Sequence, residues 1–167
     1  AYAYYLRGLY NFNRSRGFLD RFLPNDTSQR NRGANLDSYK DFGEVIQQFP
    51  NSEYAEDAAR RMLYLRNNLA RHEVHVARYY MQRGAFLAAA NRAEYVVQNY
   101  QRTPALRDAL EVMIDAYGRL GLEQLEGDAR RVLAANEDSG ALIPDPHDLV
   151  EKPLGLRIWE FFELDTN

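Results

Sequence analysis

Two parts of the chain resemble each other when the sequence is shifted by 51 positions, and this internal repeat strongly constrains the fold. The shift places Arg32-Gly33-Ala34 on Arg83-Gly84-Ala85, Val45-Ile46 on Val96-Val97, Phe49 on Tyr100, Asp57-Ala58 on Asp108-Ala109, and Met62 on Met113. A period of this length with apolar residues at helical spacing is typical of helical repeat arrays, in which each hairpin buries its apolar face on its neighbours. We therefore expect an all-α fold, an α-solenoid of antiparallel helix hairpins.

The clearest hairpin lies between His75 and Asp108. One helix is expected to end at Gly84, because glycine adopts the left-handed conformation of a helix end without a Cβ penalty. A second helix is expected over 85–100. Thr103 as N-cap and Pro104 at the first helical position then predict a third helix.

Along the whole chain, apolar spacing predicts helices over 1–11, 36–49, 53–83, 106–120 and 122–133. The stretch 53–83 fits either one long helix with a kink or a pair of helices broken near Arg71, and we favour the single helix. Turn-forming residues predict a loop insertion at about 12–33, with a short apolar patch at 18–23. We expect one repeat domain over 1–136 and a largely irregular C-terminal extension over 137–167. The extension contains the only Trp and a Phe pair, which either fold back on the domain or dock a partner.

Composition excludes several classes of function. The net charge of −3 is small and spread along the chain, which does not suggest a nucleic-acid-binding surface. No apolar run is long enough to span a membrane. The absence of cysteine excludes disulfides, thiol catalysis and thiolate metal sites within this stretch.

Motifs for catalysis, cofactors or metals are not supported. His72 and His75 are spaced i, i+3, whereas the zinc-protease helix needs i, i+4, and no third His or Cys ligand is near. No phosphate-binding glycine loop or nucleophile motif is present. We therefore expect no catalytic residue, no cofactor and no metal. One alternative is a peptide-binding adaptor or co-chaperone, in which Arg66, Arg71 and Arg78 would hold a carboxylate in a groove.

The residues predicted to bind a partner are Arg83, Asn91, Arg92, Glu94 and Tyr95. In a helix over 85–100, Ala89, Ala93 and Val96 would face inward and leave Arg92 and Tyr95 outside. An Arg beside a Tyr on a rigid helix is typical of an interface anchor. The alternative is a solvated Arg92 paired with a local glutamate.

The segments YLRGL, FPNSEYAEDA, RMLYLRNNLA, VARYYMQRGAFLAAANRAEYVVQNY and TPALRDAL together resemble the BamD family, the tetratricopeptide-repeat lipoproteins of the outer-membrane β-barrel assembly machinery. The resemblance runs from about Tyr2 to Ala135. It implies a tetratricopeptide-like solenoid, although Gln101 stands where the repeat usually has proline.

The resemblance also implies a periplasmic, non-catalytic scaffold that binds a POTRA domain of BamA and the companion lipoproteins BamC and BamE. In that family an Arg in an Asn-Arg-x-Glu motif contacts the POTRA domain, and the matching residue here is Arg92. Residue 1 falls inside a helical pattern, so we expect a fragment whose lipid-bearing Cys lies upstream. The tail 137–167 has no counterpart in the resemblance.

Overall fold

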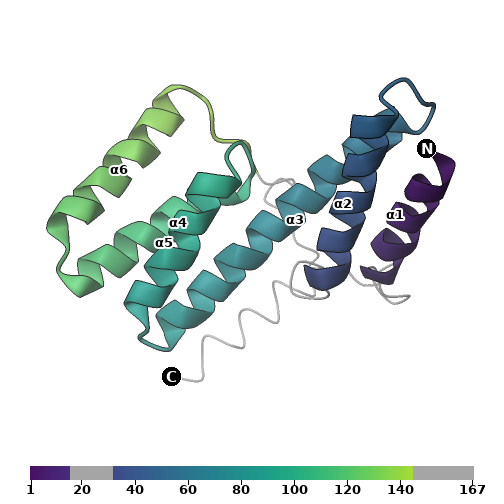
Figure 1. The fold of residues 1–167 in the computed structure, drawn as a ribbon. Coiled ribbons are helices and arrows are strands. Elements are labelled where there is room, and N and C mark those ends of the chain that lie inside the picture. Colours follow the sequence, from purple (N-terminus) through teal and green to yellow (C-terminus); the bar gives the residue numbers. More distant parts are fainter. Residues whose placement is uncertain (16–31, 145–167) are drawn as a thin grey trace, which may run out of the picture.

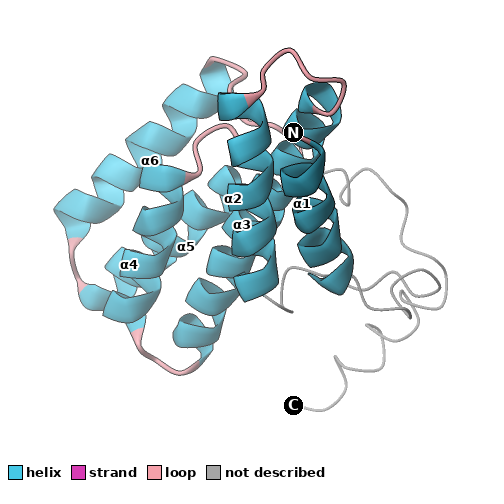
Figure 2. Cartoon of the chain, turned by 45° about the vertical axis from the view of Figure 1, so that its right-hand side comes forward, coloured by secondary structure: helices cyan, strands magenta, loops and turns pink. Residues whose placement is uncertain are grey.

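The computed structural model describes residues 1–15 and 32–144, and these residues form helices joined by short turns (Figures 1 and 2). No strand occurs within the two described ranges. The helices are α1 Tyr2–Ser15, α2 Arg32–Gln48, α3 Ala55–Gln82, α4 Phe86–Asn99, α5 Ala105–Leu120 and α6 Glu123–Asp138. The predicted all-α fold is confirmed.

The helices pack in chain order. Each helix contacts the next one, and α3 also contacts α5. Figure 1 shows α3 running from the side of α1 and α2 to the side of α4 and α5. This arrangement is the predicted solenoid of antiparallel hairpins. None of the helices in the described part of the chain has the length and apolar character needed to cross a membrane.

The internal repeat is visible in the structure. The last residue of α2, Gln48, and the last residue of α4, Asn99, are related by the same shift of 51 positions that aligns the sequence. Val45 and Val96, which the shift superposes, are both fully buried. The long helix predicted over 53–83 is present as the single helix α3.

Two groups of buried side chains form the core, and α3 contributes to both. The N-terminal core cluster consists of Phe12, Phe42, Val45, Ala58 and Leu65. The C-terminal core cluster consists of Ala70, Val74, Ala77, Ala89, Ala90, Ala93, Val96, Ala105, Ala109, Val112, Ala116, Tyr117 and Ala129. Its many alanines allow the helices of the second half to approach closely.

Glycine makes the reversals after α3 and α5, the first of which the sequence analysis predicts. Gly84 has φ 71° and Gly121 has φ 69°, both in the left-handed region. After Gly84, the Ala85 amide donates a hydrogen bond to the Tyr80 carbonyl at 2.9 Å, which satisfies an acceptor at the end of α3.

The predicted start of α5 is wrong in detail. Pro104 occupies the N-cap position, one residue before the helix, and no side chain caps the helix. The buried Thr103 hydroxyl instead donates to the Tyr100 carbonyl at 2.7 Å. Thr103 therefore stabilises the preceding turn, because its hydroxyl is used there.

Several predicted boundaries are also corrected. Helix α1 continues to Ser15 and α2 begins at Arg32, so both ends of the stretch predicted as an insertion at 12–33 are helical. The remainder of that stretch, including the apolar patch at 18–23, lies outside the described residues. Helix α6 extends to Asp138, five residues beyond the predicted helix end at 133. The extension from 145 onward, with its Trp and Phe pair, is likewise outside.

Candidate partner-binding site

The predicted partner-binding residues lie on α4 and in the turn before it. Arg92 and Tyr95 are exposed, while Ala89, Ala93 and Val96 on the opposite side of α4 are fully buried. This exposure agrees with the face expected from the helical spacing. The role of these residues in binding stays a prediction.

Arg92 is held by a buried carboxylate on another helix. Its Nη1 lies 3.1 Å from Oε2 of Glu73 on α3, and the Glu73 side chain is only 1% exposed. The other carboxylate oxygen of Glu73, Oε1, lies 3.0 Å from Nη2 of Arg32 on α2. One buried carboxylate thus links α2, α3 and α4.

The expected alternative of a local glutamate partner for Arg92 does not match this geometry. Glu94, the acidic residue nearest to it on α4, accepts a hydrogen bond from Gln98 at 3.0 Å. The glutamate that pairs with Arg92 is 19 positions away in the sequence. This pairing holds the Arg92 guanidinium in a defined orientation relative to the helix layer. A surface arginine without such a partner has no fixed orientation.

The site carries a net positive charge. Two guanidinium groups face one carboxylate, and both arginine side chains are almost half exposed, at 45% for Arg32 and 44% for Arg92. A guanidinium has several N–H donors in a planar fork, and one contact with Glu73 leaves others directed to solvent. The exposed donors can therefore bind an anionic group of another molecule.

Two tyrosines border the arginine pair. The rings of Tyr95 and Tyr100 meet edge to face with centroids 5.9 Å apart. Burial, followed by the charges of Tyr95 and Glu73, raises the pKa of Tyr100 to about 12, although Arg32 opposes this rise. The Tyr100 hydroxyl therefore stays protonated at neutral pH and can donate a hydrogen bond. We call Arg32, Glu73, Arg92, Tyr95 and Tyr100 the Arg92 surface.

The other predicted residues are not part of this cluster. Arg83 stacks over the ring of Tyr79, with its Cζ 5.2 Å from the ring centroid. Asn91 is exposed on α4, and Glu94 is occupied by Gln98. The structure brings together only Arg92 and Tyr95 from the predicted set.

Sequence reasoning missed Arg32, Glu73 and Tyr100 as members of the site. The position of Glu73 carried a signal. Leu65, Leu69, Glu73 and Ala77 follow one another at intervals of four residues, and the other three are apolar and buried. A charged residue on a buried stripe needs a charged or hydrogen-bonding partner. Nothing in the sequence indicated which arginines would supply it.

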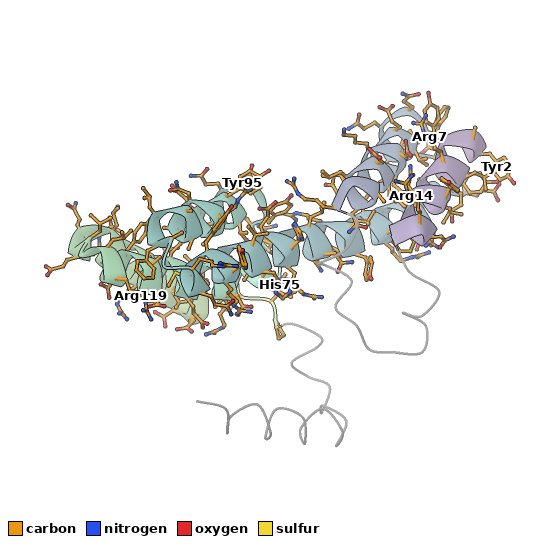
Figure 3. The ribbon with its side chains drawn as sticks, turned by 90° about the horizontal axis from the view of Figure 1, so that it is seen from below. Tyr2, Arg7, Arg14, His75, Tyr95 and Arg119 are labelled. Carbon is orange, nitrogen blue, oxygen red and sulfur yellow. The ribbon has the colours of Figure 1, made fainter. Side chains whose placement is uncertain are left out.

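The opposite side of the helix layer is different in character. Figure 3 shows Tyr95 on one side of the layer and His75 and Arg119 on the other. A depression of about 480 Å³ there is lined by His72, His75, Val76, Arg78, Tyr79 and Gln82. No cluster able to hold a metal ion lies among residues 1–15 and 32–144.

Two of the three arginines named for a peptide-binding adaptor, Arg66 and Arg78, contact different groups within the protein. Arg78 pairs with Asp108 at 2.9 Å, and Arg66 donates to the Gln101 carbonyl. The guanidinium groups of Arg66 and Arg78 do not share a carboxylate, whereas those of Arg32 and Arg92 share Glu73. The geometry therefore favours the Arg92 surface as the candidate site.

Comparisons with a family model and with individual proteins point to the same family. Residues 1–133 match the family model described as outer membrane lipoprotein (YfiO). A relative from Neisseria meningitidis serogroup A, named outer membrane protein assembly factor BamD, is 47% identical over 135 residues, covering 81% of this chain and 51% of the relative. Proteins of the same name from Xylella fastidiosa strain Temecula1 and Haemophilus influenzae are 42% and 36% identical, covering 81% and 83% of this chain and 46% and 53% of theirs.

The chain spans about half the length of these curated relatives. The matched region includes all of α1 to α5 and most of α6, and with them the Arg92 surface. The chain belongs to the outer membrane lipoprotein family whose curated members are named outer membrane protein assembly factor BamD.

Proposed function

We propose that this chain is part of a non-catalytic scaffold of the outer-membrane β-barrel assembly machinery and that it binds a POTRA domain of BamA through the Arg92 surface. The names of the relatives support the assembly role. The observation that carries the binding site is the exposed Arg92 of the Asn91-Arg92-Ala93-Glu94 motif, fixed in place by the buried Glu73.

The packing around Arg92 suits a binding anchor. Helix α4 lies between α3 and α5, and its inner residues are fully buried, so the backbone that carries Arg92 is held firmly. The ion pair with Glu73 also restricts the side chain. An anchor that is already oriented loses less conformational entropy on binding than a free side chain does.

The remaining partners and the location belong to the same proposal. The scaffold would lie at the periplasmic face of the outer membrane, attached by a lipid on a cysteine upstream of this chain. It would also bind the companion lipoproteins BamC and BamE. The family description as an outer membrane lipoprotein supports the location.

Replacing Arg92 with Glu tests the binding site. The substitution reverses the charge presented to the partner, and loss of an interface anchor typically costs about 1–3 kcal/mol, so calorimetry with a purified POTRA fragment should show affinity reduced about fivefold or more. Arg92→Gln, which adds no negative charge beside Glu73, should also weaken binding. Unchanged affinity in both folded variants would reject Arg92 as the anchor.

A matched control is available on α6. Arg131 is 75% exposed and pairs with Asp128 on its own helix, so Arg131→Gln removes the same charge from a different surface. We expect this variant to bind the POTRA fragment like the original chain. An equal loss with Arg131→Gln would indicate a general effect of net charge.

A further inference from the structure

Glu73 uses its two oxygens for arginines from two different helices. Oε1 faces Arg32 of α2, and Oε2 faces Arg92 of α4. The carboxylate is buried, whereas both guanidinium groups are almost half exposed. Tyr100, whose ring contacts that of Tyr95, lies within reach of the charges of both Glu73 and Arg32. Arg32 therefore has the same relation to the buried carboxylate as the proposed anchor Arg92.

We propose that Arg32 is a second partner-contacting residue of the Arg92 surface, that Arg32 and Arg92 together bind one acidic side chain of the partner, and that Glu73 positions both arginines. This inference rests on the proposed function, since it assumes that the partner docks on this surface. It adds a residue that neither the helical pattern of α4 nor the matching motif includes.

The charges of the site support an acidic ligand. The pair of arginines exceeds the charge of Glu73, which leaves an excess positive charge at the surface. Arg32 is also the first residue of α2, and the first turn of α2 contains no acidic residue. The positive end of the helix dipole adds to the charge there without an acidic side chain of that turn to offset it.

The shape of the donors favours a carboxylate of a protein partner. Guanidinium groups bind carboxylates through parallel N–H donors, and two such groups around one acceptor can share its oxygens. Tyr95 on α4 is 40% exposed, and tyrosine and arginine are enriched among the residues that contribute most to binding at protein interfaces. An anionic lipid headgroup is the competing ligand, and the experiment separates the two.

The main test compares Arg32→Gln with Arg92→Gln in the full chain. Each variant leaves one arginine to pair with Glu73, so we expect the fold to be retained. We expect Arg32→Gln to weaken binding to the POTRA fragment by about tenfold, comparable to Arg92→Gln. It should also reduce the dependence of the affinity on salt concentration, because one charge contact is removed.

Two results would overturn the role of Arg32. The first is an affinity within twofold of the original chain while Arg92→Gln binds weakly. The second is an effect of Arg32→Gln on sedimentation with phosphatidylglycerol vesicles but not on POTRA binding. If neither the original chain nor any variant binds the POTRA fragment, the proposed function fails instead, and the two failures are thereby distinguished.

Glu73→Gln tests the positioning role separately. Removal of this negative charge makes the surface more positive, so a purely electrostatic site would bind an acidic partner more tightly. A site that depends on orientation would bind several-fold more weakly, since the amide cannot accept from both arginines. We expect the weaker binding in protein whose circular dichroism is unchanged, and equal or tighter binding would overturn the positioning role.

Discussion

At the residue scale, the Asp57 carboxylate shows how a single side chain joins distant helices. The Tyr5 hydroxyl on α1 donates to Asp57 Oδ2 on α3 at 2.6 Å, and Arg61 contacts the same oxygen from one turn further along α3. The hydrogen bond from Tyr5, followed by that from Arg61, holds the pKa of Asp57 below its usual value. The same hydrogen bond raises the pKa of Tyr5, because ionised Tyr5 could not donate it.

The lowered pKa predicts how stability depends on pH. The charged Asp57 is stabilised in the folded state, so its contribution to stability is present above the ordinary aspartate pKa of 3.8 and is lost as pH falls through the lower pKa of the folded state. Asp57→Asn should lower the urea midpoint at pH 7, and the difference from the original chain should shrink near pH 3. Tyr5→Phe should reproduce part of the loss at pH 7. A difference that does not change with pH would contradict this prediction.

At the scale of elements, corresponding residues of the repeat have different local roles. Gly33 and Gly84 align under the 51-residue shift, but Gly33 is the second residue of α2 and Gly84 lies after α3 with φ 71°. Neither glycine has a neighbour within 4 Å of an added Cβ, so only the backbone conformation distinguishes them. The 51-residue shift aligns the two glycines, but the helix starts do not correspond. Helix α4 begins at Phe86, after Gly84, whereas α2 begins at Arg32, before Gly33.

This pair supplies a matched test. Gly84→Ala should lower the free energy of unfolding by about 1–2 kcal/mol, because alanine is strained in the left-handed conformation. Gly33→Ala should raise the free energy of unfolding by roughly 0.5 kcal/mol, because alanine favours the helix. Urea denaturation measures both changes. Equal effects of the two substitutions would show that the conformations at the two sites do not differ as described.

Gly8 constrains the packing of α1 on α2 in another way. A Cβ at Gly8 would lie 2.7 Å from Cε1 of Phe42, whose ring is fully buried, and the Ser38 hydroxyl donates to the Gly8 carbonyl at 2.9 Å. Gly8→Ala should therefore cost about 1–3 kcal/mol through overpacking, although alanine is the better helix former. Thermal unfolding checks this, and an Ala variant as stable as the original chain would contradict the close approach of the two helices.

At the scale of the whole molecule, α3 connects the two core clusters and Glu73 connects the helices on either side of α3. Leu65 belongs to the N-terminal core cluster, and Val74 belongs to the C-terminal core cluster. Glu73 pairs with Arg32 at the start of α2 and with Arg92 in the middle of α4. The ion pairs therefore join a helix of the first half to a helix of the second half.

The shared carboxylate predicts a non-additive effect on stability. Arg32→Gln or Arg92→Gln alone should cost about 1 kcal/mol, because the remaining arginine still pairs with Glu73. The double substitution leaves a buried carboxylate without a charged partner and should cost about 3–5 kcal/mol. Urea denaturation of the single and double variants measures the coupling, and strictly additive losses would contradict a shared buried partner.

Sequence alone determined the helices, their order and the repeat. The helices and their ends depend on residues that are close together in the sequence, such as those spaced around Val45 and Val96 on apolar stripes and Gly84 at a turn. The start of α5 could not be predicted correctly from the sequence. The Thr103 hydroxyl can either cap α5 or bond to the preceding turn, and only the geometry of that turn decides between the two.

The exposure of Arg92 and Tyr95 could likewise be read from the spacing of Ala89, Ala93 and Val96. The meeting of Arg92 with Glu73 and Arg32 could not, because these residues lie on three helices and far apart in the sequence. Only the tertiary packing of α2 and α4 against α3 decided which arginines reach the buried carboxylate. The physical reason is that helical periodicity specifies which side of a helix is buried, whereas contacts between helices depend on how their buried sides fit together in three dimensions.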